Sequence, residues 1–204
     1  MTPERTPSFS LMQAVKRRFF AMRNGDLAAQ MARGGINYRI NFGLNLPQIT
    51  EIAQAARSGR LPDNAHIPDN EERRELARLL WENDTTRESR LIAPMLYDAD
   101  DLNADLASGL LRGVTTTEEA DVLCHRLLRR YPAAEKLALE ILADSGASEM
   151  QRYGALRLLM NLMIMGRADL AATEAAVEAE RQRDCRLTAA VCRQLRDEID
   201  FAKE

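Results

Sequence analysis

The sequence predicts an all-α protein, an α-solenoid of about eleven helices arranged in antiparallel pairs. Apolar residues recur at three- and four-residue spacing almost throughout, as in Leu76, Leu79 and Leu80, which is the period of an amphipathic helix. Helix start and stop signals divide this pattern into short segments. From residue 70 onward, predicted helix pairs begin every 30 to 35 residues, as in stacked helical repeats. A compact irregular bundle is the alternative architecture.

The helix boundaries rest on capping residues and proline. Pro47 suits the first position of a helix, and Thr85 with Glu88 and Thr115 with Glu118 have the Thr-x-x-Glu spacing of a capping box. The predicted helices span residues 8–24, 26–33, 47–58, 70–83, 86–97, 100–112, 116–130, 132–144, 148–165, 167–182 and 184–203. We expect them to form one domain over residues 1–204, with residues 1–10 as a flexible tail.

One segment lacks the helical period. Residues 36–46, "INYRINFGLNL", alternate apolar and mostly polar side chains, which is the pattern of a half-buried strand. A second segment of this kind is missing from the sequence. We therefore predict an extended connector with its apolar side on neighbouring helices, admitted by a turn at Gly34 and Gly35.

Composition excludes several classes of protein. The chain has 204 residues, 46% of them hydrophobic and 29% charged, and its net charge is −3. No run approaches the roughly 18 apolar residues that cross a bilayer, so we expect a cytoplasmic protein without a membrane span. Cys124, Cys185 and Cys192 have no CxxC spacing and only two histidines accompany them, so we expect reduced thiols, no zinc site and no cofactor. The acidic net charge argues against binding nucleic acid by bulk attraction, although a local basic patch can still bind it.

The stretch "LLWENDTTRESRLIAPML" encodes a tight helical hairpin with Trp81 as its apolar anchor. Leu-Trp, a short polar turn and then Arg-Glu-Ser-Arg-Leu-Ile-Ala resemble a motif of the DNA alkylation repair family, the HEAT-like alkylpurine DNA glycosylases of the AlkD type. The segments "FGLNLPQITEIAQAA", "EEADVLCHRLL" and "MQRYGALRLL" follow the order of that family's repeats. The resemblance covers about residues 35–165 and implies HEAT-like helix pairs.

The resemblance also implies a function. Such enzymes hold duplex DNA on a basic concave face and release N3- or N7-alkylated purines, using a carboxylate to stabilise the sugar cation, tryptophans beside the lesion and an arginine on the phosphate backbone. By this resemblance, the position of the catalytic carboxylate holds Cys124, the tryptophan positions hold Ala120 and Arg193 or a neighbour of it, and Arg152 lies where the phosphate-contacting arginine would be. Asp121, three residues before Cys124, is the only catalytic candidate.

Each candidate also has a simpler structural interpretation. Arg152 and Arg157 are predicted to bind nucleic acid, or else to be solvated arginines opposite an apolar stripe. Asp121 also suits a first-turn acid favoured by the helix dipole. Cys124 and His125 are consecutive helical residues and cannot face one another, so Cys124 is interpreted as a small buried group.

Near the N-terminus, "KRRFFAMR" places Lys16, Arg17 and Arg18 beside two phenylalanines. These three are further nucleic-acid-binding candidates, with an anionic membrane surface or simple capping of the repeat stack as alternatives.

Two functions follow from these observations. The first is a DNA alkylation repair-like protein that binds duplex DNA and has weak or no alkylpurine glycosylase activity. The alternative is a non-enzymatic scaffold that holds a protein or peptide in its groove.

Overall fold

The computed structural model describes residues 6–203, and within them about two thirds of the chain is helical and no β-strand forms. The chain divides into two compact units, Met1–Asp101 and Leu102–Glu204. The predicted all-helical repeat fold is confirmed. The expectation of one domain over residues 1–204 stays a prediction. None of the helices in the described part of the chain is both long and apolar enough to cross a lipid bilayer.

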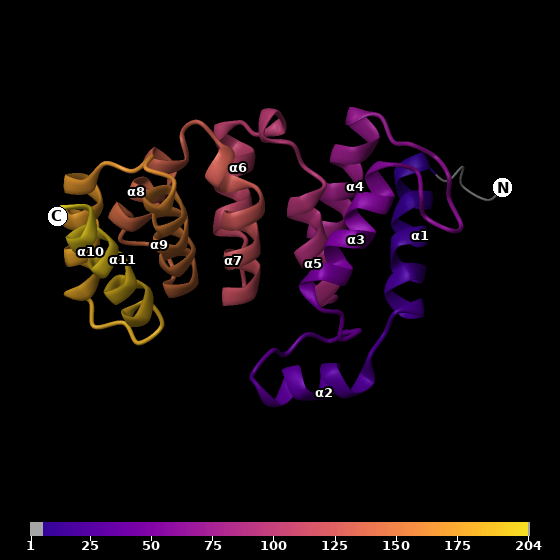
Figure 1. Cartoon of the computed structure of the whole chain (residues 1–204), viewed down its shortest axis with the longest axis horizontal. Coiled ribbons are helices and arrows are strands. Elements are labelled where there is room, and N and C mark those ends of the chain that lie inside the picture. Colours follow the sequence, from indigo (N-terminus) through magenta and orange to yellow (C-terminus); the bar gives the residue numbers. More distant parts are fainter. Residues whose placement is uncertain (1–5, 204) are drawn as a thin grey trace. The chain divides into compact units, whose positions relative to one another are not determined.

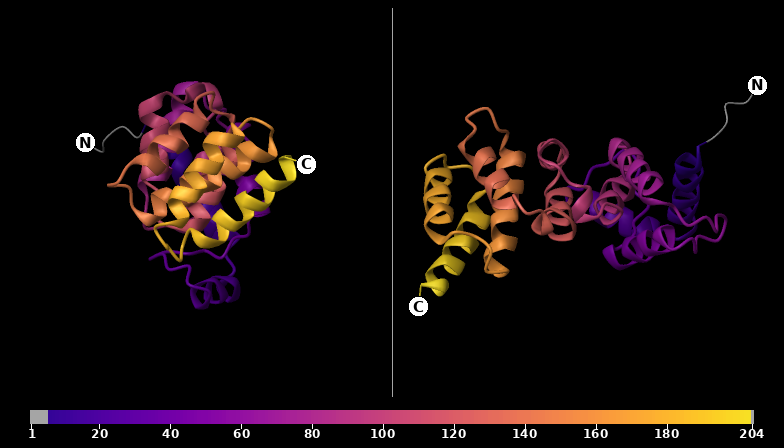
Figure 2. Two further views of the ribbon diagram at one scale, coloured as in Figure 1. Left: turned by 90° about the vertical axis from the view of Figure 1, so that its left-hand side faces the viewer. Right: turned by 90° about the horizontal axis from the view of Figure 1, so that it is seen from above.

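Five α-helices form the N-terminal unit (Figure 1). They are α1 (Pro7–Ala21), α2 (Gly25–Arg33), α3 (Leu46–Arg57), α4 (Asn70–Glu82) and α5 (Arg87–Ile92), followed by the 3-10 turns η1 (Ala93–Met95) and η2 (Ala99–Asp101). Helix α1 packs on α4, and α3 packs on α5. Helix α2 has no buried residue and stands apart from the others of its unit, as the left view of Figure 2 also shows. Residues 7–10, expected as part of a tail, belong to α1, and residues 1–5 lie outside the described residues.

Six α-helices form the C-terminal unit. They are α6 (Ala104–Arg112), α7 (Thr117–Arg126), α8 (Ala134–Ala143), α9 (Glu149–Ile164), α10 (Leu170–Arg181) and α11 (Ala189–Ala202), with the 3-10 turn η3 (Leu128–Arg130) after α7. The second helices of successive pairs pack together, α7 on α9 and α9 on α11, while α8 contacts both α6 and α10. This two-layer arrangement is that of stacked helical repeats.

The segment before α3 is extended, as predicted. Gly35 has a φ of 92°, a conformation that glycine adopts without steric cost, and it turns the chain out of α2. Ile40 then forms an isolated parallel bridge with Thr86: its N–H donates to the Thr85 carbonyl at 2.9 Å, and its carbonyl accepts the Arg87 N–H at 3.1 Å. The connector is thus held by the start of α5 rather than by a second strand.

The polar residues of "TTRESR" have a different role from the predicted capping box. Thr86, not Thr85, precedes α5, and its side chain caps no amide. The Glu88 carboxylate is fully buried and accepts the backbone N–H groups of Phe42 at 3.1 Å and Leu44 at 3.3 Å. It also forms an ion pair with Arg87 at 3.2 Å. Burying a charge costs free energy unless the charge is paired and hydrogen-bonded, and these contacts meet both conditions for Glu88. The sequence expectation was wrong because a tertiary contact displaced the local cap.

Trp81 is only partly buried, which corrects its interpretation as a core anchor. The guanidinium of Arg90 lies over its ring, 3.5 Å from the centroid, and donates to the Trp81 carbonyl at 2.6 Å. Cation–π stacking therefore shapes this hairpin together with apolar burial.

Two helix starts in the C-terminal unit also differ from prediction. Thr116, not Thr115, caps α7 by accepting the Glu119 N–H at 3.2 Å. Helix α11 begins at Ala189 instead of residue 184, because Asp184 has a left-handed φ of 49°.

The loop before α11 is fixed by the buried Thr188 hydroxyl, which donates to Glu180 at 2.9 Å.

Candidate nucleic-acid interface

Three helices of the C-terminal unit place polar side chains around one carboxylate. Asp121 on α7 accepts hydrogen bonds through Oδ1 from the Tyr153 hydroxyl at 3.1 Å and from Arg157 Nε at 2.7 Å, both on α9. The Arg157 guanidinium also lies 3.5 Å from Gln194 Oε1 of α11. The side chains of Asp121 and Arg157 are 40% and 28% exposed, so solvent and a ligand can reach them. We call these four residues the Asp121 cluster.

Close helix packing positions this cluster. A Cβ at Gly154 would lie 2.8 Å from Leu111 Cδ1, so a larger residue here would require the Leu111 side chain of α6 to shift. The Cys124 thiol of α7 donates to the Gly154 carbonyl at 3.3 Å and links α7 to the same turn of α9. Tyr153 and Arg157 are four residues apart and share one face of α9, which faces Asp121.

Burial sets the protonation of the groups near Asp121. The pKa of Tyr153 is raised to about 12, first by burial and then by the nearby Asp121 charge, so the phenol remains a hydrogen-bond donor. Burial also raises the pKa of the Cys124 thiol far above its ordinary value, and the side chain is fully buried. Cys124, at the position of the family carboxylate, is therefore a neutral core group, whereas Asp121 lies at the surface.

Arg152 lies in a different environment from Arg157. It is 9% exposed, and its Nε is 3.2 Å from Glu180 Oε1 and 3.1 Å from Oε2, while a terminal nitrogen donates to the Ala147 carbonyl. Glu180 is 2% exposed, so the two form a buried ion pair that joins α9 to α10. Arg152 is therefore neither the solvated arginine nor the exposed phosphate contact expected from the sequence.

A second group of polar side chains continues the same surface along α7 and α9. His125 Nδ1 lies 3.2 Å from Asn161 Oδ1 and 3.4 Å from a terminal nitrogen of Arg129. Asn161 donates to the Arg157 carbonyl at 2.7 Å and so connects this group to the Asp121 cluster. Tyr153, Asn161 and Gln194 are not among the site residues predicted from the sequence. The four-residue spacing of Tyr153, Arg157 and Asn161 does indicate that these three side chains share one face of a helix.

The basic residues of α1 lie in the N-terminal unit. Arg17 pairs with Asp63 at 2.9 Å, and Arg18 pairs with Glu51 at 3.5 Å. Both pairs are at least partly exposed, and such pairs contribute about 0–1 kcal/mol. Burial lowers the pKa of the Lys16 ammonium.

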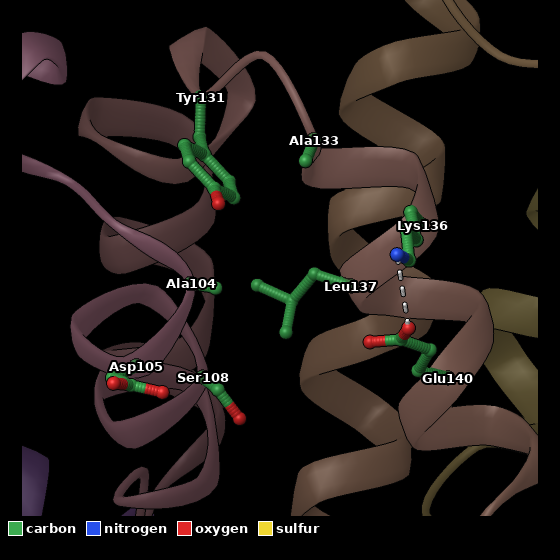
Figure 3. A pocket seen from close by; sticks show the side chains of 8 residues that line it. All are labelled: Ala104, Asp105, Ser108, Tyr131, Ala133, Lys136, Leu137 and Glu140. Atoms are coloured by element: carbon green, nitrogen blue, oxygen red, sulfur yellow. Dashed lines mark ion pairs between the residues drawn. The ribbon is translucent and has the colours of Figure 1, made fainter.

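A hollow of about 440 Å³ lies between α6 and α8 (Figure 3). Leu137 projects into it from α8, opposite Ser108 and Asp105 of α6, and Tyr131 borders one end. The Lys136–Glu140 pair at 3.8 Å leaves its α8 side without net charge. This mixed lining suits a phosphate backbone less well than the α7–α9 surface. Within residues 6–203, no three His, Cys, Asp or Glu side chains gather as they would to hold a metal ion.

Comparison with known proteins identifies a family. The sequence model described as DNA alkylation repair enzyme matches residues 15–184, which is most of the chain. No curated protein and no solved structure matches.

Proposed function

We infer the function of this chain from one premise: it belongs to the DNA alkylation repair enzyme family. We propose that it binds duplex DNA at the α7–α9 surface without sequence preference, and that it releases alkylated purines slowly or not at all. The observation that carries the proposal is the partly exposed Asp121–Arg157 pair, which places a phosphate-binding guanidinium beside a partly exposed carboxylate.

Arg157 is the proposed phosphate contact. Its guanidinium is partly exposed and offers donors that suit a phosphate oxygen. Arg152 supports the site indirectly in this proposal, because its ion pair with Glu180 fixes the turn of α9 that carries Tyr153 and Arg157. Lys16, Arg17 and Arg18 remain proposed backbone contacts of the N-terminal unit.

Slow base release follows from the surroundings of Asp121. A sugar cation needs a fixed negative charge close by, and losing one such stabilising group costs about 10²–10³ in rate. The Asp121 charge is already offset by Arg157 at 2.7 Å, and the buried Cys124 thiol carries no charge. Ala120 is fully buried and Arg193 is exposed, so neither tryptophan position supplies a ring to a cationic lesion, a loss of about 0.5–2 kcal/mol per ring.

A duplex-binding titration at several salt concentrations tests the binding proposal. Each phosphate contact contributes about 0.9 to the slope of log K against log salt, so Arg157→Ala should lower both affinity and slope. Arg196→Ala is the matched control, because Arg196 is an exposed arginine on α11 with its own partner, Glu178 at 3.7 Å. Wild-type protein without salt-dependent binding would contradict the proposal and favour the protein or peptide scaffold.

A glycosylase assay on methylated duplex tests the catalytic proposal. We expect wild-type protein to release N7-methylguanine and N3-methyladenine little faster than the uncatalysed reaction, and Cys124→Ala to behave in the same way. Rapid release by wild-type protein would refute weak activity, and its loss in Asp121→Asn would then assign the catalytic carboxylate to Asp121.

A further inference from the structure

Half of the twelve arginines of the C-terminal unit are paired with a carboxylate. Arg112 pairs with Asp144 at 2.9 Å, and Arg152 and Arg157 pair as described above. The other six have no carboxylate within ion-pair distance among the described residues. Two of them, Arg186 and Arg193, lie just before α11 and within it. The remaining four, Arg126, Arg129, Arg130 and Arg167, are here called the arginine cluster.

Backbone contacts bring these four residues together. Arg126 ends α7, Arg129 and Arg130 belong to η3, and Arg167 arrives from the loop after α9. Arg167 donates to the Arg129 carbonyl at 2.7 Å and lies 3.4 Å from the Tyr131 carbonyl. Arg130 donates to the Arg126 carbonyl at 2.6 Å. Arg167, 38 residues from Arg129 in sequence, is thus anchored against η3.

The loop after α9 is shaped to deliver Arg167. Gly166 has a φ of 63°, and its N–H donates to the Met163 carbonyl at 2.9 Å. The Arg167 N–H donates to the Leu162 carbonyl at 2.9 Å, which completes a helix-ending turn. The position of Arg167 is therefore fixed at its backbone as well as at its guanidinium.

The nearby carboxylates are engaged elsewhere. Asp169 caps α10 by accepting the Ala172 N–H at 2.7 Å, and Glu135 accepts the Asp169 N–H at 2.5 Å. The negative end of α7 offsets some positive charge, but this effect is confined to the last helical turn, and Arg130 and Arg167 lie beyond it. The Nε of Arg126 is also buried without a hydrogen-bond partner. No ion pair among the described residues offsets the four guanidinium charges, so the cluster can bind an anion.

We propose that the arginine cluster anchors the phosphodiester backbone of duplex DNA. Guanidinium groups bind phosphate oxygens in a bidentate manner, and several of them on one short segment can hold successive phosphates. The cluster continues the proposed interface, because contacts run from Arg129 through His125 and Asn161 to Arg157 and Asp121. The inference rests on the proposed function and adds that the main electrostatic contact lies at η3, beyond the Asp121 cluster.

The test compares the salt dependence of duplex binding for three double variants of the full chain. Arg129→Ala/Arg130→Ala removes two proposed contacts, so the slope of log K against log salt should fall by about 1.8. Arg129→Lys/Arg130→Lys keeps both charges and should keep the slope. Arg181→Ala/Arg196→Ala, which removes two exposed arginines that pair with Glu178, is the control and should match wild type.

Thermal unfolding separates a binding role from a structural one. Because Arg129 and Arg130 have no carboxylate partner within ion-pair distance and Arg130 loses only its hydrogen bond to the Arg126 carbonyl, their replacement by alanine should change the melting temperature little. Arg129→Gln/Arg130→Gln repeats the test should the alanine variant fold poorly.

The outcomes distinguish this inference from the proposed function. A wild-type slope in Arg129→Ala/Arg130→Ala would overturn the arginine cluster while leaving duplex binding in place. A reduced slope there with an unchanged one in Arg157→Ala would support the cluster and remove Arg157 from the interface. Absence of salt-dependent binding by wild-type protein would overturn both.

Discussion

Arg157 on α9 and Asp121 on α7 form a 2.7 Å ion pair at a surface that also carries the Tyr153 hydroxyl. The pair lies in the stretch where the family resemblance places catalysis. The Asp121 carboxylate and the Arg157 guanidinium are, however, already bound to each other in an ion pair. If duplex DNA binds here as proposed, its phosphate has to compete with Asp121 for Arg157.

This competition predicts opposite effects for the two partners. Asp121→Asn should raise duplex affinity up to about 5-fold, since a partly exposed pair contributes at most about 1 kcal/mol, whereas Arg157→Ala should lower it. Fluorescence anisotropy at low salt measures both effects. Lower affinity in Asp121→Asn would show that the carboxylate supports binding instead of competing with it.

Glu88 should be essential to the N-terminal unit. Glu88→Ala removes the buried carboxylate that pairs with Arg87 and accepts two connector amides, and we expect the free energy of unfolding to fall by about 3–5 kcal/mol in urea denaturation. Glu51→Ala, which breaks only the exposed pair with Arg18, should cost under about 1 kcal/mol. Equal losses in the two variants would contradict a special role for Glu88.

Trp81 and Arg90 should be energetically coupled. A double-mutant cycle with Trp81→Ala and Arg90→Ala is expected to give a coupling energy of about 0.5–2 kcal/mol, the range of a cation–π contact. Because Trp81 is only partly buried, Trp81→Ala should cost less than the about 3–5 kcal/mol of a fully buried tryptophan. A coupling near zero would mean that the stacked geometry adds no stability.

Gly43 holds α2 against the connector. Its φ is 71°, and an added Cβ would lie 2.1 Å from the Asn24 carbonyl oxygen, so Gly43→Ala should destabilise by more than the about 1–2 kcal/mol of left-handed strain alone. Gly166→Ala is the control, since Gly166 has a φ of 63° with nothing within 4 Å and should show the strain only. A smaller loss at Gly43 than at Gly166 would show that α2 moves away without cost.

Tyr153 should titrate late. Its pKa is raised to about 12, above the value near 10 of an unfolded tyrosine, so the phenol form favours the folded state. The associated stability is fully present below pH 10 and is lost as the pH rises through about 12. Burial raises the pKa of Tyr97 to about 12 as well, so ultraviolet absorbance of phenolate should show a high-pH step that becomes smaller, but does not vanish, in Tyr153→Phe. A step near pH 10 assigned to Tyr153 would contradict its burial beside Asp121.

The sequence alone determined the helical architecture. Helical spacing and capping residues located all eleven α-helices of the described chain, and the glycine pair and apolar alternation identified the extended connector. These features depend on local backbone geometry and on which side chains avoid water, both of which are written in neighbouring residues. The order of family segments likewise indicated the family that the sequence model matches.

The tertiary structure decided which charged side chains are available. Glu88 has the spacing of a helix cap but binds a connector 44 residues away, Arg152 matches a phosphate contact but is buried against Glu180, and Arg167 joins η3 from 38 residues downstream. A long polar side chain can reach many partners, and burial raises the free-energy cost of leaving it unpaired, so its role depends on what the packed helices bring within reach. Local sequence does not encode that proximity.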